Sequence, residues 1–130
     1  MSVQMELHKI IINEMLDQQI IQLKEVDGDR KFSIMIGNNE ASAIDRRLKG
    51  QPMPRPMTHD LLANIIEAMG GVMEKIEIND LQEHTFFARI HIRMNGHSIE
   101  VDSRPSDAIA LGIASTLPIF VAEHVLEEVA

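Results

Sequence analysis

The sequence predicts an α+β protein made of duplicated β3α2 units, with a mainly antiparallel sheet and helices packed on it. Apolar strand patterns come in two groups of three, and each group is followed by helical patterns. The two groups are 65 positions apart, half of the 130-residue chain. Three aligned pairs carry this offset: Ile36 with Val101, Ala43 with Ala108, and Ile44 with Ile109. We therefore expect a single domain with pseudo-repeats over about 1–65 and 66–130.

The first half begins with three strands and a helix. Apolar β-branched residues predict strands over Met5–Ile12 and Gln19–Val26. Asp27-Gly28-Asp29 predicts the turn into a third strand, Arg30–Ile36, whose apolar residues alternate with polar ones. A Gly-Asn-Asn sequence stops this strand, and Glu40–Leu48 has helical spacing.

A proline-rich segment leads to the second helix of the first half. Gly50–Pro56 carries three prolines, which are incompatible with a helix interior, so we expect an extended linker. Thr58 is placed to cap the next helix, and Gly70-Gly71 ends it. One apolar stripe marks this helix: Leu61, Leu62, Ile65, Ile66 and Met69.

The second half repeats this order. Thr85–Met94 has the clearest strand alternation in the chain, and Asn95-Gly96 is typical of a two-residue hairpin turn. The other expected elements are strands over Val72–Asn79 and His97–Val101, a helix over Pro105–Ala114, a short apolar run Ile119–Val121, and a last helix Ala122–Val129.

The composition limits the function classes. Acidic residues outnumber basic ones by 20 to 12, which gives a formal net charge of −8 and argues against non-specific nucleic-acid binding through a basic surface. Four Phe, without Trp or Tyr, argue against a base-stacking platform. Cysteine is absent, which excludes disulfides and fits a reducing compartment.

The sequence also lacks the marks of a membrane protein. No apolar stretch approaches the roughly 20 residues of a membrane span. Residues 1–13 contain no long apolar run after a basic start, unlike a signal peptide. We expect a cytoplasmic protein without a membrane partner.

Two polar motifs stand out: Arg-Pro-Met-Thr-His-Asp-Leu at 55–61 and Asp-Ser-Arg-Pro-Ser-Asp-Ala-Ile-Ala-Leu at 102–111. They resemble the hallmark motifs of the bifunctional nuclease family. Ile36-Gly37 with Glu40-Ala41, and the ending Pro118–Val121, resemble further family elements. Ser103 and Gly112 stand where the family more usually has Ala. The resemblance implies hydrolysis of DNA and RNA.

In a nuclease, the polar residues of these motifs would share the work of phosphodiester hydrolysis. The candidate catalytic residues, as metal ligands or bases, are His59, Asp60, Asp102 and Asp107. The candidate phosphate-binding residues are Arg55, Arg104 and Ser106. Carboxylates and imidazoles of this kind suit Mg²⁺ or Mn²⁺, so either metal could serve as cofactor, and DNA or RNA would be the partner.

A structural interpretation of the same residues stays open. Thr58, Asp60 and the polar residues at 102–107 can cap helices, and Arg104 can pair with a nearby acid or with Glu40 across the repeat. The basic stripe Arg89, His91 and Arg93 favours a solvated face over a nucleic-acid groove. The alternative function is a non-catalytic regulatory or oligomeric binding module. Exposed sheet edges and nine Met residues predict a homodimer or higher homo-oligomer.

Overall fold

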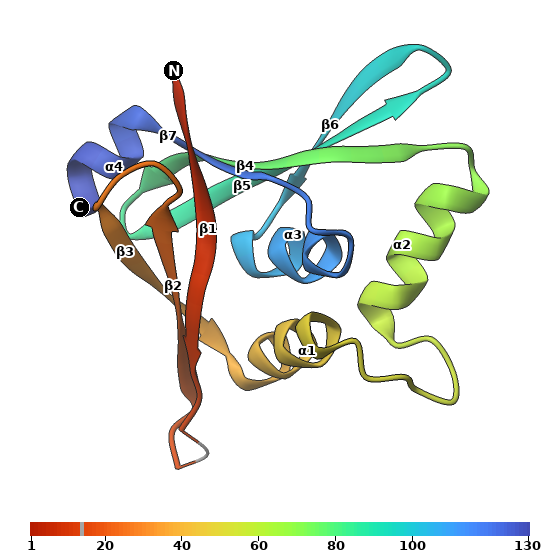
Figure 1. The fold of residues 1–130 in the computed structure, drawn as a ribbon, viewed down its shortest axis with the longest axis horizontal. Coiled ribbons are helices and arrows are strands. Elements are labelled where there is room, and N and C mark those ends of the chain that lie inside the picture. Colours follow the sequence, from red (N-terminus) through yellow and green to blue (C-terminus); the bar gives the residue numbers. More distant parts are fainter. Residues whose placement is uncertain (14) are drawn as a thin grey trace.

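The computed structural model describes residues 1–13 and 15–130, which form one seven-stranded sheet and four α-helices (Figure 1). The strand order is β3-β2-β1-β7-β4-β5-β6. All neighbouring strands pair antiparallel except β4 and β7, which are parallel. The α+β class and the mainly antiparallel sheet with helices packed on it are confirmed.

Each half of the chain contributes an antiparallel meander of three strands. The first contains β1 (Ser2–Ile11), β2 (Gln18–Glu25) and β3 (Lys31–Gly37). The second contains β4 (Val72–Gln82), β5 (Thr85–Met94) and β6 (His97–Ser103). The predicted hairpin turn joins β5 to β6, and Asn95 and Gly96 both have the positive φ angles, 53° and 76°, that a type I′ turn requires.

Strand β7 (Ile119–Ala122) joins the two meanders. It pairs with β1 on one side and with β4 on the other. The expected order of three strands and two helices per half therefore holds for the first half, whereas the second half has a fourth strand. Ile119 and Val121 are 4% and 0% exposed, so this short apolar run sits at the centre of the sheet and its core.

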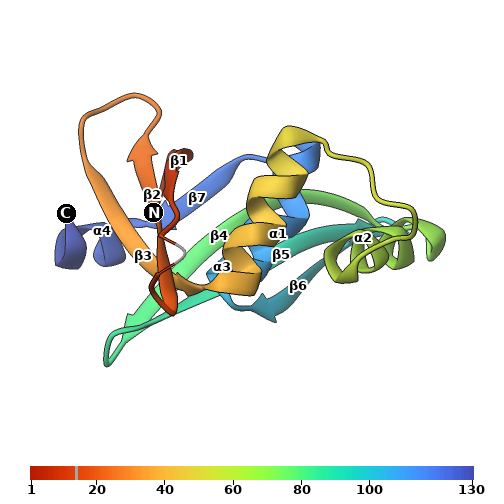
Figure 2. The ribbon, with the colours of Figure 1, turned by 90° about the horizontal axis from the view of Figure 1, so that it is seen from below.

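Helices α1 (Asn38–Lys49) and α3 (Pro105–Gly112) lie side by side on the sheet (Figures 1 and 2). Each follows the last strand of its meander, and each buries an Ala-Ile set against the strands: Ala41 and Ile44 from α1, Ala108 and Ile109 from α3. Pro105 is the first residue of α3, as its fixed φ favours. A 3-10 turn, Ile113–Ser115, follows α3, and α4 (Glu123–Val129) packs on β4 and β7.

Helix α2 (Thr58–Ala68) contacts α3 and β4, yet none of its residues is buried. Thr58 is its first residue and Met57 its N-cap, so the expected Thr58 cap is displaced by one position. The predicted apolar stripe exists, but because α1 and α3 occupy the sheet, α2 stands beside them with the stripe largely exposed. None of the helices among the described residues has the length and apolar character to cross a membrane.

The C-terminal end of α3 packs against β4 without room for a larger residue. A Cβ on Gly112 would lie 2.5 Å from Cδ1 of Ile76, which is 1% exposed, and 3.2 Å from Cβ of Leu117. Gly112→Ala should therefore overpack the core, which lowers the free energy of unfolding by about 1–3 kcal/mol. The higher helix propensity of Ala offsets ~0.5–1 kcal/mol of this loss. Equilibrium denaturation measures the loss.

Ile76→Val removes the methyl group in the way and alone costs about 0.5–1.5 kcal/mol. The Gly112→Ala, Ile76→Val double variant should thus lose less free energy of unfolding than the two single variants lose in sum. Additive effects would show that Ile76 does not limit the residue size at position 112.

Candidate active site

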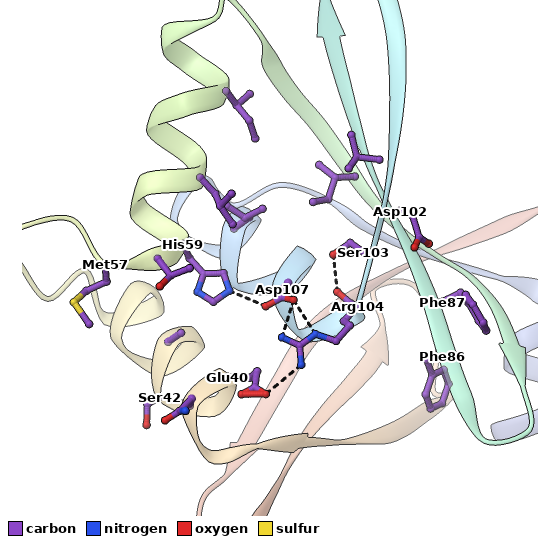
Figure 3. A pocket seen from close by; sticks show the side chains of 18 of the residues that line it. Glu40, Ser42, Met57, His59, Phe86, Phe87, Asp102, Ser103, Arg104 and Asp107 are labelled. Carbon is purple, nitrogen blue, oxygen red and sulfur yellow. Dashed lines mark hydrogen bonds and ion pairs between the residues drawn. The ribbon is translucent and has the colours of Figure 1, made fainter.

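A cleft with a volume of about 1140 Å³ lies among α1, α2, α3 and the strands β5 and β6. One end is polar and contains Glu40, His59, Arg104 and Asp107 (Figure 3). The other end is apolar and lies between α2 and the sheet. Its walls come from both halves of the chain, so the cleft exists only when α1, α2, α3 and the β5–β6 hairpin are assembled.

Asp107 is the centre of the polar end. Its Oδ1 is 2.9 Å from His59 Nε2, and its Oδ2 accepts a hydrogen bond from Arg104 Nε at 2.9 Å and forms an ion pair with Arg104 Nη2 at 2.8 Å. Arg104 also donates from Nη1 to Glu40 Oε1 at 3.3 Å, which is the predicted pairing across the repeat. Asp107, first by its hydrogen bonds and then by its charge, raises the pKa of Arg104 above its ordinary value, and Glu40 adds to this.

Exposure differs sharply within this cluster. The side chain of Arg104 is 65% exposed, whereas those of His59 and Asp107 are 12% and 29% exposed. Gly37 precedes α1 and lets Glu40 fold back, because a Cβ there would lie 2.8 Å from Glu40 Oε1. The guanidinium is thus presented to the cleft, with carboxylates behind it and the imidazole beside it.

Asp60 does not line the cleft, although it is adjacent to His59 in sequence. Its Oδ2 accepts the backbone N–H of Met57 at 2.9 Å and lies 3.2 Å from Arg46 Nη1, and its Oδ1 accepts from Arg47. The Met57 N–H, followed by the two arginines, lowers the pKa of Asp60 below its ordinary value of 3.8. Asp60 thus caps α2, as the structural interpretation of the sequence has it, and it also ties α2 to α1, which that interpretation did not include.

The other three candidates lie apart from the cluster. Asp102 lies opposite Arg89 in the β5–β6 register, so its side chain is on the other face of the sheet from Ile90 and Val101. It lines the edge of the cleft, away from the Arg104 guanidinium (Figure 3). Ser106 is 5% exposed and does not line the cleft. Arg55 is exposed in the linker, and it does not line the cleft either.

The basic stripe on β5 is neutralised by acids on the neighbouring strands. Three pairs achieve this: Arg89 with Glu100 at 3.4 Å, His91 with Glu77 at 3.0 Å, and Arg93 with Glu74 at 3.0 Å. No three His, Cys, Asp or Glu side chains within residues 1–13 and 15–130 converge as a metal site would require. A protein-built Mg²⁺ or Mn²⁺ centre therefore does not fit the residues of this cleft.

Two arginines of α1 were missed by sequence reasoning. Arg46 lines the cleft, and Arg47 donates from Nη2 to the carbonyl oxygen of Leu111 at 3.1 Å and from Nε to that of Ala110. The available signal was their place in the last turn of α1, where cations are favourable. That signal does not reveal that they reach α2 and α3.

The fold and the cleft define an α+β domain with an Arg–His–carboxylate cluster between its two halves. The sequence matches the family model of the bifunctional nuclease domain over residues 21–130, so the chain belongs to that family. It is 40% identical over 119 residues to an uncharacterized protein of Mycobacterium tuberculosis strain H37Rv, covering 92% of this chain and 71% of that protein. It is 25% identical over 109 residues to Bifunctional nuclease 1 of Oryza sativa subsp. japonica, covering 81% of this chain and 33% of that one.

The structural role of Asp60 makes a pH-dependent prediction. Asp60→Asn should lower the free energy of unfolding at pH 7 by about 1–3 kcal/mol, because it leaves Arg46 and Arg47 without their anionic partner. Because folding lowers the pKa of Asp60, its stabilisation is complete above the ordinary value of 3.8 and is lost as pH falls through the folded-state value. The difference between wild type and variant should therefore shrink below about pH 4.

Urea denaturation at several pH values measures this difference. Asp45→Asn is the matched control, since Asp45 forms only a surface pair with Lys49 on α1 and should cost less than about 1 kcal/mol. An Asp60→Asn effect that is as small as the control, or that is the same at pH 3 and pH 7, would contradict the assignment.

Proposed function

We propose that this protein hydrolyses phosphodiester bonds of DNA or RNA in the cleft, with the His59–Asp107–Arg104 cluster as its active site. The observation that carries the proposal is the convergence of these three residues, from two distant segments, at one end of a cleft of about 1140 Å³. Membership of the family and the likeness to a plant protein named a bifunctional nuclease support the same reaction class. We also propose a cytoplasmic location, because a chain without cysteine fits a reducing compartment.

Each residue has a distinct role in this mechanism. An imidazole that donates its Nε2–H to Asp107 keeps Nδ1 as a proton acceptor, so His59 removes the proton of the attacking water. The water oxygen bonds to phosphorus as the P–O bond to the leaving sugar oxygen breaks, and that oxygen takes up a proton from solvent. Asp107 orients His59 and stabilises the imidazolium that forms. Arg104 binds the non-bridging phosphate oxygens and stabilises the charge that develops on them. Asp60, Asp102, Arg55 and Ser106 have no direct role in this scheme.

The mechanism assigns no step to a metal, because the cleft residues do not form a three-ligand site. Glu40 and Asp107, the two carboxylates nearest the proposed phosphate position, are both bound to Arg104. Mg²⁺ can also bind through substrate phosphates and water. Assays with added Mg²⁺, with Mn²⁺ and with a chelator therefore test whether the reaction needs a metal ion.

His59→Ala and Arg104→Ala should each lower nuclease turnover by about 10²–10⁴-fold, because they remove the base and the phosphate ligand. Their melting temperatures should stay close to that of the wild type, since neither residue belongs to the buried core. Activity on single-stranded and duplex DNA and RNA is measured on the same samples as thermal melting.

The matched controls are His124→Ala and Arg89→Ala, which remove a His–carboxylate and an Arg–carboxylate pair outside the cleft. They should retain wild-type turnover. Undiminished turnover in a folded His59→Ala, Arg104→Ala double variant would place the active site elsewhere. Loss of stability in both single variants, with no nuclease activity in the wild type, would favour a non-catalytic binding module.

We also propose self-association, for which the exposed side of α2 is a specific surface. Leu61, Ile65 and Met69 form one row along this helix, called here the outer row, and they are 52%, 43% and 67% exposed. None of the three lines the cleft. A contiguous apolar row of this kind is typical of protein interfaces.

Light scattering at micromolar concentration should give a mass of at least two 14.6 kDa chains. Ile65→Lys should lower that mass, because a charge in an apolar interface loses its hydration. Asn64→Lys adds the same charge on the same exposed helix outside the row and should leave the mass unchanged. A wild-type mass of one chain would end this idea.

A further inference from the structure

The apolar end of the cleft is a slot between α2 and the sheet. It is lined by Leu62 and Ile66 of α2 and by Ile90, Ile92 and Val101 of the sheet. The slot narrows toward Gly71, where a Cβ would lie 3.0 Å from Cγ2 of Ile66 and 3.1 Å from Cγ2 of Ile92. Leu62 and Val101 remain 40% and 41% exposed, so the accessible part of the slot lies beside them, whereas Ile90 and Ile92 are nearly buried.

The slot is aligned with the polar cluster by the geometry of α2. Positions 59, 62 and 66 have i, i+3, i+7 spacing, so His59, Leu62 and Ile66 form one row, called here the cleft row. A ligand that contacts His59 with an anionic group can therefore place an adjoining apolar group against Leu62 and Ile66. The ligand that matches this layout has an anion and a flat apolar body next to each other.

We infer that the slot receives one unstacked base of a single-stranded nucleic acid, whose adjoining phosphodiester then lies at His59 and Arg104. This inference rests on the proposed function and names its substrate class. The walls are aliphatic, and enzymes that hold an unstacked base do so between aromatic or apolar side chains. The five slot side chains carry no hydrogen-bonding group, so they cannot read a base edge, and the binding is independent of base identity.

Charge excludes a duplex from the same site. A duplex carries one negative charge per ~1.7 Å of axis, and proteins hold it through several Lys or Arg contacts to phosphates. The polar end offers Arg104 and His59 against Glu40 and Asp107, Asp102 adds a carboxylate elsewhere on the cleft lining, and Arg46 is already paired with Asp60. The cleft can accommodate one phosphodiester group, and the base must supply the remaining affinity.

The test compares three phosphorothioate probes by fluorescence anisotropy. They are a short single-stranded oligothymidylate, a strand of the same length with abasic units, and a hairpin duplex of the same total charge. The oligothymidylate should bind at least about tenfold more tightly than either of the others. Cleavage of the corresponding phosphodiester strands is measured in parallel.

Two double variants provide the comparison. Leu62→Ala, Ile66→Ala in the cleft row should weaken oligothymidylate binding by about tenfold and leave the abasic probe unaffected. The control, Met35→Ala, Leu48→Ala, removes exposed apolar side chains outside both the cleft and the outer row and should leave both affinities unchanged. Thermal melting checks that both variants fold.

Equal affinity for the thymidylate and abasic strands, or for the strand and the hairpin, would overturn the inference. Slot-dependent binding without cleavage would support the slot and contradict the proposed hydrolysis. Cleavage of both strands at equal affinity would contradict the slot and leave the hydrolysis standing.

Discussion

Arg47 holds the three helices around the cleft in place. From α1 it donates to two carbonyl oxygens at the end of α3 and to the Asp60 carboxylate at the start of α2. Its side chain is only 9% exposed, so each lost contact would leave a charged group partly desolvated without a partner. Because α2 buries none of its own residues, this ion-paired contact takes the place of a packed core in fixing where α2 begins.

The position of His59 follows from that contact. Successive residues on a helix point about 100° apart, so when Asp60 turns toward α1, His59 turns toward the cleft and Asp107. Arg104 and Asp107 reach the same point because α3 starts where the edge strand β6 ends. The cluster thus depends on two junctions that are distant in sequence, and the α1–α3 contact holds them together.

Secondary-structure elements could be predicted from the sequence wherever the signal for them lies in neighbouring residues. The alternation of β5, the Asn95-Gly96 turn and the proline linker each depend on neighbouring residues, and the structure has a strand, a turn and a non-helical linker there, which bends at 54–55 instead of staying extended. β7 was not predictable to the same degree, because a four-residue apolar run becomes a strand only by pairing with β1 and β4. His59 and Asp60 were both candidates, since motif reading cannot tell which of two adjacent residues faces the cleft.

Arg104 connects the charge balance of the cleft to the kind of ligand it can hold. Its guanidinium already pairs with Asp107 and Glu40, so a phosphate that approaches it competes with two carboxylates. An isolated phosphate gains little from this exchange, because one ion pair replaces another in a largely exposed setting. A ligand that also buries an apolar body against Leu62 and Ile66 gains free energy that the ion-pair exchange does not provide. The carboxylates thereby oppose bare anions, and the apolar slot favours anions that carry a base.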